Sequence, residues 1–163
     1  MVECRMMMTL TDRSPSFARK RLLGSILLDR DLITQDQLKH ALKIQEKQEG
    51  YFGKILVDLG YISEHDIVTA FVIQCHVPYI AIDQYSIDQS TLRLVPGKIA
   101  RKYHVVPLDQ VNEILSIVMA DPLDIEAKND LQHITNCRLV PFIATQGEIE
   151  KALHRWYDLD DNE

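Results

Sequence analysis

The sequence predicts an α+β fold: an N-terminal helical lobe of two tandem helix-turn-helix repeats, and a small α/β lobe with a three- to four-stranded sheet. Two observations predict it. Segment 23–45 recurs as segment 52–74, and the chain after residue 76 alternates β-prone runs with helical runs. The predicted parts are a disordered tail over 1–16, the repeat lobe over 17–76, the α/β lobe over 77–157 and an acidic tail over 158–163.

The repeat holds position by position, 29 residues apart. Gly24 and Leu27 of the first copy recur as Gly53 and Leu56 of the second. Each copy reads as a helix, a turn and a second helix, because an N-cap residue precedes each second apolar stripe. These paired units are expected to bury their apolar faces against each other.

The caps and turns support this interpretation. Thr34 and Ser63 are good N-caps, and the residue three positions later, Gln37 or Asp66, can complete a capping box. Gly60 is expected to end a helix in the left-handed conformation. The first copy has an aspartate, Asp31, at that position, which adopts the conformation at some cost.

A glutamine closes the apolar stripe of each copy, Gln45 in the first and Gln74 in the second. A glutamine on a buried stripe needs hydrogen-bond partners for its amide. Those partners are backbone groups of the sister repeat, the edge of a bound ligand, or the neighbouring loop. The sequence leaves the three alternatives open.

The second half predicts an extended stretch and then alternating helices and strands. In chain order we expect an extended stretch at 77–82, a helix at 91–103 capped by Ser90 and interrupted near Pro96, strands at 105–108 and 114–119 joined by a turn at 109–113, a helix at 125–134, a strand at 138–144 and a helix at 146–156.

Composition excludes several classes of function. The net charge of −6 argues against DNA or RNA binding, which depends on neutralising phosphates. No apolar run approaches the length of a membrane span, and the N-terminus lacks a signal-peptide pattern, so no membrane insertion is expected. Three cysteines without CxxC spacing indicate reduced thiols in the cytoplasm.

No catalytic pattern stands out. The run from Gly50 to Ile55 lacks the spacing and hydroxyl of a phosphate-binding loop, and the six histidines are scattered without metal-binding spacing. Cys75 beside His76 is interpreted as a buried thiol at a helix end. We therefore expect no catalytic residues, no metal and no required cofactor.

The repeat, together with the run from Met119 to Asp124, resembles the N-terminal domain of type II secretion and type IV pilus assembly ATPases. That domain is also described as a cyclic di-GMP-binding module in the mannose-sensitive pilus ATPase. The resemblance covers Arg21 to Tyr157. It implies cyclic di-GMP as a ligand, or a protein partner of a secretion- or pilus-type assembly.

The resemblance also implies a ligand site on the two repeats. The candidate residues are Arg21, Leu23, Gly24, Leu27, Leu28, Leu32, Gln45, Tyr51, Gly53, Leu56, Val57, Gly60, Tyr61 and Gln74. The sequence departs from the family pattern at three positions. Leu22 and Tyr51 stand where the pattern has arginine, and Asp31 replaces a glycine of the first copy.

Two functions compete at this point, and neither is catalytic. In the first, the domain is a docking module for a protein of a secretion or pilus machine. In the second, it is a nucleotide sensor that holds cyclic di-GMP between its repeats. A third interpretation is that the chain is a piece of a longer motor protein.

Overall fold

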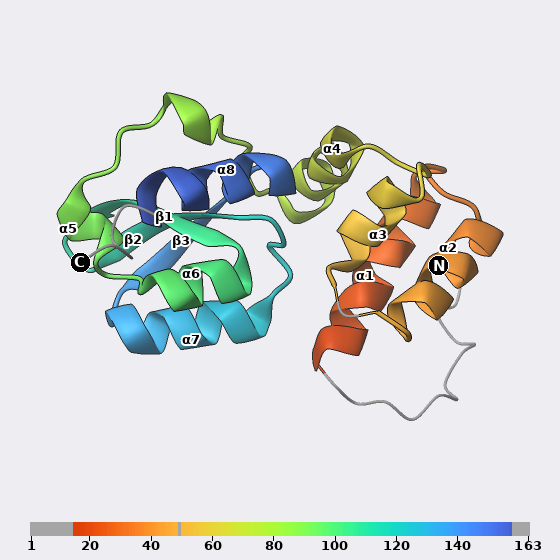
Figure 1. The fold of residues 1–163 in the computed structure, drawn as a ribbon, viewed down its shortest axis with the longest axis horizontal. Coiled ribbons are helices and arrows are strands. Elements are labelled where there is room, and N and C mark those ends of the chain that lie inside the picture. Colours follow the sequence, from red (N-terminus) through yellow and green to blue (C-terminus); the bar gives the residue numbers. More distant parts are fainter. Residues whose placement is uncertain (1–14, 49, 158–163) are drawn as a thin grey trace.

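The computed structural model describes residues 15–48 and 50–157, with side chains from residue 22 onward (Figure 1). The predicted tails, 1–16 and 158–163, lie outside these ranges, except that Pro15 and Ser16 begin the first helix. Two lobes lie side by side along the long axis of the molecule (Figure 1). Within the described part, no helix is both long enough and apolar enough to cross a membrane.

In the described residues, the first lobe contains four helices: α1 (Pro15–Asp29), α2 (Gln35–Gln45), α3 (Phe52–Asp58) and α4 (Glu64–Cys75). Their apolar faces form one core, in which Leu27 and Leu56 are fully buried. Both predicted capping boxes are present, at the start of α2 and at the start of α4. The repeat is therefore confirmed as two helical hairpins.

The turns inside the two hairpins have the same hydrogen-bond pattern. Asp31 and Gly60 both adopt the left-handed conformation, with φ of 55° and 70°. The next residue then donates its N–H to the carbonyl five positions back, at 3.0 Å in the first copy and 3.1 Å in the second. This pattern is the Schellman motif, and it confirms the predicted role of Gly60 and Asp31.

The two repeat glycines also occupy equivalent environments. A Cβ atom at Gly24 would lie 2.8 Å from Leu38, and one at Gly53 would lie 3.2 Å from Ile67, the residue equivalent to Leu38. Each glycine therefore lets the two helices of its own hairpin approach closely. The contact accounts for a glycine at the same place in both copies.

The left-handed turns give a matched pair of predictions. We expect Gly60→Ala to lower the free energy of unfolding by about 1 kcal/mol, because alanine is strained at positive φ. Asp31→Gly is expected to raise it by about 0.5 kcal/mol, because glycine adopts this conformation without strain. Urea unfolding measures both. Changes of the same sign would contradict equivalent turns.

The second lobe contains a three-stranded sheet in the order β1-β2-β3. The elements are η1 (Ile82–Gln84), α5 (Gln89–Leu92), α6 (Gly97–Tyr103), β1 (Val105–Val111), β2 (Ile114–Met119), α7 (Ile125–Thr135), β3 (Arg138–Ile143) and α8 (Gln146–Tyr157). Strand β2 pairs antiparallel with β1 and parallel with β3. Consecutive β2 residues, Ile117 and Val118, are both fully buried, so both faces of the sheet are covered. Figure 1 shows the strands between α8 and α7.

The predicted fold class is confirmed, with two corrections in detail. The stretch expected to be extended, 77–82, contributes one isolated bridge to the sheet, from Tyr79 to Ile143, and its last residue begins η1. Strand β1 continues to Val111, so the hairpin turn is shorter than the predicted 109–113. Ser90 lies inside α5 and does not cap it, because Asp88 occupies the N-cap position. The interruption near Pro96 is confirmed.

Candidate functional site

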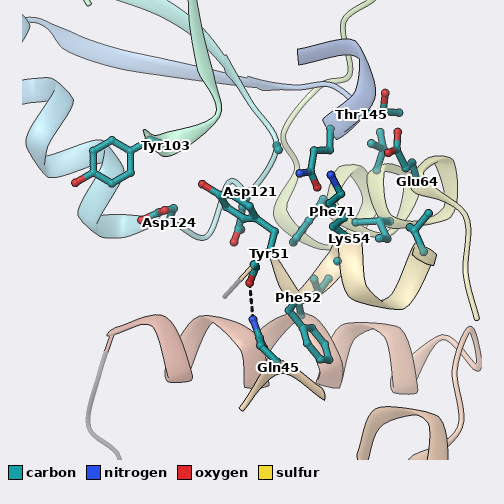
Figure 2. A pocket seen from close by; sticks show the side chains of 18 of the residues that line it. Gln45, Tyr51, Phe52, Lys54, Glu64, Phe71, Tyr103, Asp121, Asp124 and Thr145 are labelled. Atoms are coloured by element: carbon teal, nitrogen blue, oxygen red, sulfur yellow. Dashed lines mark hydrogen bonds between the residues drawn. The ribbon is translucent and has the colours of Figure 1, made fainter. Parts of the chain in front are cut away.

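A cleft of about 580 Å³ lies where the two lobes meet (Figure 2). One wall comes from the helical lobe and includes Gln45, Tyr51 and Phe71. The other wall comes from the α/β lobe and includes Tyr103 and Asp121. Its volume is within the range of pockets that hold small organic ligands.

Polar contacts beside the cleft tie the two lobes together. The Tyr51 hydroxyl donates to the backbone carbonyl of Lys102 at 2.9 Å. The Tyr51 ring meets the His104 ring edge-on, with centroids 4.6 Å apart. On the α8 side, the Glu64 carboxylate accepts the Gly147 N–H at 3.2 Å. The N-terminal ends of α3 and α4, the two helices of the second repeat, are thus bonded to the α/β lobe.

Gln45 is a buried polar side chain on the cleft wall, with 9% of its surface exposed. Its amide nitrogen donates to the Gly50 carbonyl at 2.7 Å, which confirms the loop-capping alternative for this group (Figure 2). Its Oε1 atom is buried and has no partner among the described residues. A buried acceptor without a donor is costly, so it is suited to receive a ligand N–H.

The described charges on the cleft wall are predominantly acidic. Five carboxylates line it: Glu46, Glu64, Asp121, Asp124 and Glu126. Three lysines also line it: Lys47, Lys54 and Lys102. Asp121 accepts the Leu123 N–H at 2.9 Å, and the buried Asp124 caps α7 through the Ala127 N–H at 2.9 Å. Turn and cap hydrogen bonds therefore hold these two carboxylates in place.

Two groups at the lobe contact have shifted pKa values. The Lys102 ammonium donates to the Tyr103 hydroxyl at 2.6 Å, and this hydrogen bond raises the pKa of Lys102. Burial lowers the pKa of His104, although Glu150 lies 3.8 Å from its ring nitrogen and acts in the opposite direction. Lys102 on the cleft wall therefore keeps its charge at neutral pH, and burial disfavours the charged form of His104.

Of the fourteen predicted site residues, only a minority line the cleft. Five line the cleft: Leu23, Gln45, Tyr51, Gly53 and Val57. The others lie elsewhere: Leu27 and Leu56 are fully buried in the helical core, Gly24 is buried, Leu28, Leu32 and Tyr61 are half-buried, and Gly60 and Gln74 are exposed. The Arg21 side chain lies outside the described residues.

The predicted site included no residue of the α/β lobe. That lobe contributes Lys102, Tyr103, Asp121, Asp124 and Thr145 to the cleft wall. One signal was available, because Asp121 lies within the family-like turn from Met119 to Asp124. No cluster of histidine, cysteine and carboxylate groups that could hold a metal ion occurs in the described ranges.

Comparison with known proteins identifies the family. The sequence matches the MshEN domain over residues 75–163, which is more than half of the chain. The chain belongs to the MshEN domain family. The match confirms that this MshEN domain resembles the N-terminal domains of secretion and pilus ATPases.

Curated relatives agree with this assignment. The chain is 31% identical, over 83% of its length, to the type IV pilus assembly ATPase PilB of Myxococcus xanthus, and 26% identical to PilB of Thermus thermophilus, also over 83%. It is 30% identical over 84% of its length to bacteriophage adsorption protein B of Escherichia coli. The MshEN chain spans 24%, 15% and 18% of these relatives.

Solved structures match the fold. MshE with cyclic di-GMP superposes with a TM-score of 0.68 at 25% identity, covering 83% of this chain and 98% of that one. The N-terminal domain of XpsE superposes with a TM-score of 0.70 at 19% identity, covering 91% and 99%. The XpsE likeness shows the fold alone.

Proposed function

We propose that this MshEN domain is a regulatory module that binds cyclic di-GMP in the cleft between its lobes. The observation that carries the proposal is the Oε1 atom of Gln45, which is buried on the cleft wall and has no hydrogen-bond partner among the described residues. The similarity to MshE, whose structure contains cyclic di-GMP, supports the choice of ligand. Binding across the cleft would contact both lobes at once.

The chemistry of the cleft suits a guanine base. The Watson–Crick edge of guanine presents N–H donors, and an acceptor such as the Gln45 carbonyl or the Asp121 carboxylate can receive them. Adenine presents an unprotonated ring nitrogen on the same edge, which such acceptors repel. Phe52 and Phe71 lie behind the same wall, where they are buried in the helical core and make this side of the cleft apolar.

The glutamine pair of the repeat gives a matched test. Gln45→Met keeps the side-chain volume and removes the amide, and we expect it to weaken cyclic di-GMP binding at least tenfold in calorimetry. Gln74→Met changes the equivalent, exposed glutamine and is expected to leave the affinity within twofold. Gln45→Glu keeps an acceptor but loses the donor to Gly50, so it separates ligand contact from loop capping.

Three outcomes contradict the proposal. Absence of binding heat at saturating cyclic di-GMP excludes the ligand and leaves protein docking as the function. Equal loss of affinity in Gln45→Met and Gln74→Met excludes the specific role of the buried glutamine. Equal affinity for cyclic di-AMP excludes base recognition by these acceptors.

We also propose that a protein of a secretion- or pilus-type machine docks on this domain in the cytoplasm, and that the domain itself is not catalytic. The pilus assembly ATPases among the relatives support the docking partner. The lack of a phosphate-binding loop supports a role without catalysis. Both statements stay predictions.

A further inference from the structure

We propose that Lys54 and Lys102, one from each lobe, bind the phosphates of the ligand and thereby join the two walls of the cleft. The inference rests on the proposed function, because it concerns the same cleft. It names the residues that supply positive charge to a dianionic ligand in an acidic site. It also predicts which contacts make ligand binding depend on the relative position of the lobes.

The negative charge of the cleft wall opposes the binding of a dianionic ligand. A cyclic dinucleotide carries one negative charge on each of its two phosphates, and five carboxylates already line the cleft. An anion in such a site needs cations close by to offset the repulsion. Among the described residues, the cations on the wall are Lys47, Lys54 and Lys102.

Lys54 and Lys102 line opposite walls of the cleft, and a hydrogen bond joins the segments that carry them. Lys54 lies in the first turn of α3, three residues after Tyr51. The Tyr51 hydroxyl is bonded to the backbone carbonyl of Lys102, in the last turn of α6. One hydrogen bond therefore fixes the backbones that carry both lysines across the lobe contact.

Both ammonium groups can exchange their carboxylate partners for a phosphate. The Lys54 ammonium lies 3.5 Å from Glu150, and the Lys102 ammonium lies 3.9 Å from Glu126 and 4.0 Å from Asp130. These separations exceed the 2.7–2.9 Å or so of a charge-assisted hydrogen bond. Lys102 also donates to the Tyr103 hydroxyl at 2.6 Å, and because an ammonium has three N–H donors it can keep that bond and still donate to a phosphate. Both side chains are about half exposed, so these ion pairs are weak and solvent-screened. A phosphate at direct hydrogen-bond distance would compete well with them.

Charge-removing variants test the inference. Calorimetry with cyclic di-GMP at low and high salt compares Lys54→Gln, Lys102→Gln and Lys151→Gln, the last a lysine exposed on α8 and outside the cleft. We expect the first two to weaken binding about tenfold each and to reduce its salt dependence. Lys151→Gln is expected to match the wild type in both respects, and Lys54→Arg to retain affinity. Guanosine, which has no phosphate, is expected to bind all variants equally.

The outcomes separate this inference from the proposed function. If the wild type binds, Gln45→Met does not, and both cleft lysine variants behave like Lys151→Gln, the lysine assignment is wrong and the ligand site stands. If the wild type shows no binding, both proposals fall together. Thermal unfolding of each variant identifies any affinity loss caused by misfolding, and Lys54→Arg then decides whether charge is what matters.

Discussion

Leu27→Ala and Leu56→Ala are each expected to lower the free energy of unfolding by about 3 kcal/mol. Both leucines are fully buried in the core of the helical lobe. They occupy equivalent positions in the two hairpins, and each backbone carbonyl accepts the hydrogen bond that closes the following turn. Removing either side chain leaves a cavity at the same place in its copy.

Urea unfolding followed by circular dichroism measures these losses. Leu22→Ala is the matched control, because Leu22 lies on the same helix as Leu27 with 53% of its surface exposed. We expect that variant to change stability by less than about 0.5 kcal/mol. A loss at Leu27 several times larger than at Leu56 would contradict two equivalent hairpins in one core.

The features that the sequence predicted correctly depend on short-range chemistry. A capping box needs only residues three positions apart, so Thr34 with Gln37 and Ser63 with Asp66 could be recognised directly. The left-handed turn at Gly60 is likewise a local property of glycine. The strand boundaries were less accurate, because β1 extends to Val111 through pairing with β2.

The cleft could not be predicted in the same way, because it depends on how the lobes pack. Gln45 and Gln74 close equivalent apolar stripes in the repeat, yet the first is buried on the cleft wall and the second is exposed. Leu27 and Leu56 match the family's ligand pattern but are fully enclosed in the core. The partner of Tyr51 is the carbonyl of Lys102, which no local pattern identifies.

Ile143→Ala is expected to have a comparable effect on stability and a further effect on cooperativity. The backbone of Ile143 belongs to the sheet of the α/β lobe, where it pairs with Met119. Its N–H also donates to the Pro78 carbonyl at 2.9 Å, and its carbonyl accepts the Ile80 N–H at 3.0 Å. Its side chain is fully buried in the core of the helical lobe. One residue thus joins the sheet of one lobe to the core of the other.

Truncating this side chain removes apolar contact between the lobes and leaves the sheet intact, because its backbone hydrogen bonds are retained. We expect a loss of about 3 kcal/mol and separate unfolding of the helical lobe, seen as two transitions in calorimetry where the wild type shows one. Val140→Ala, on the same strand but 37% exposed, is the control and should keep one transition. A single transition in Ile143→Ala would mean that the polar contacts of Tyr51 and Glu64 suffice to couple the lobes. A ligand held between both walls would then act on lobes that already move as one body.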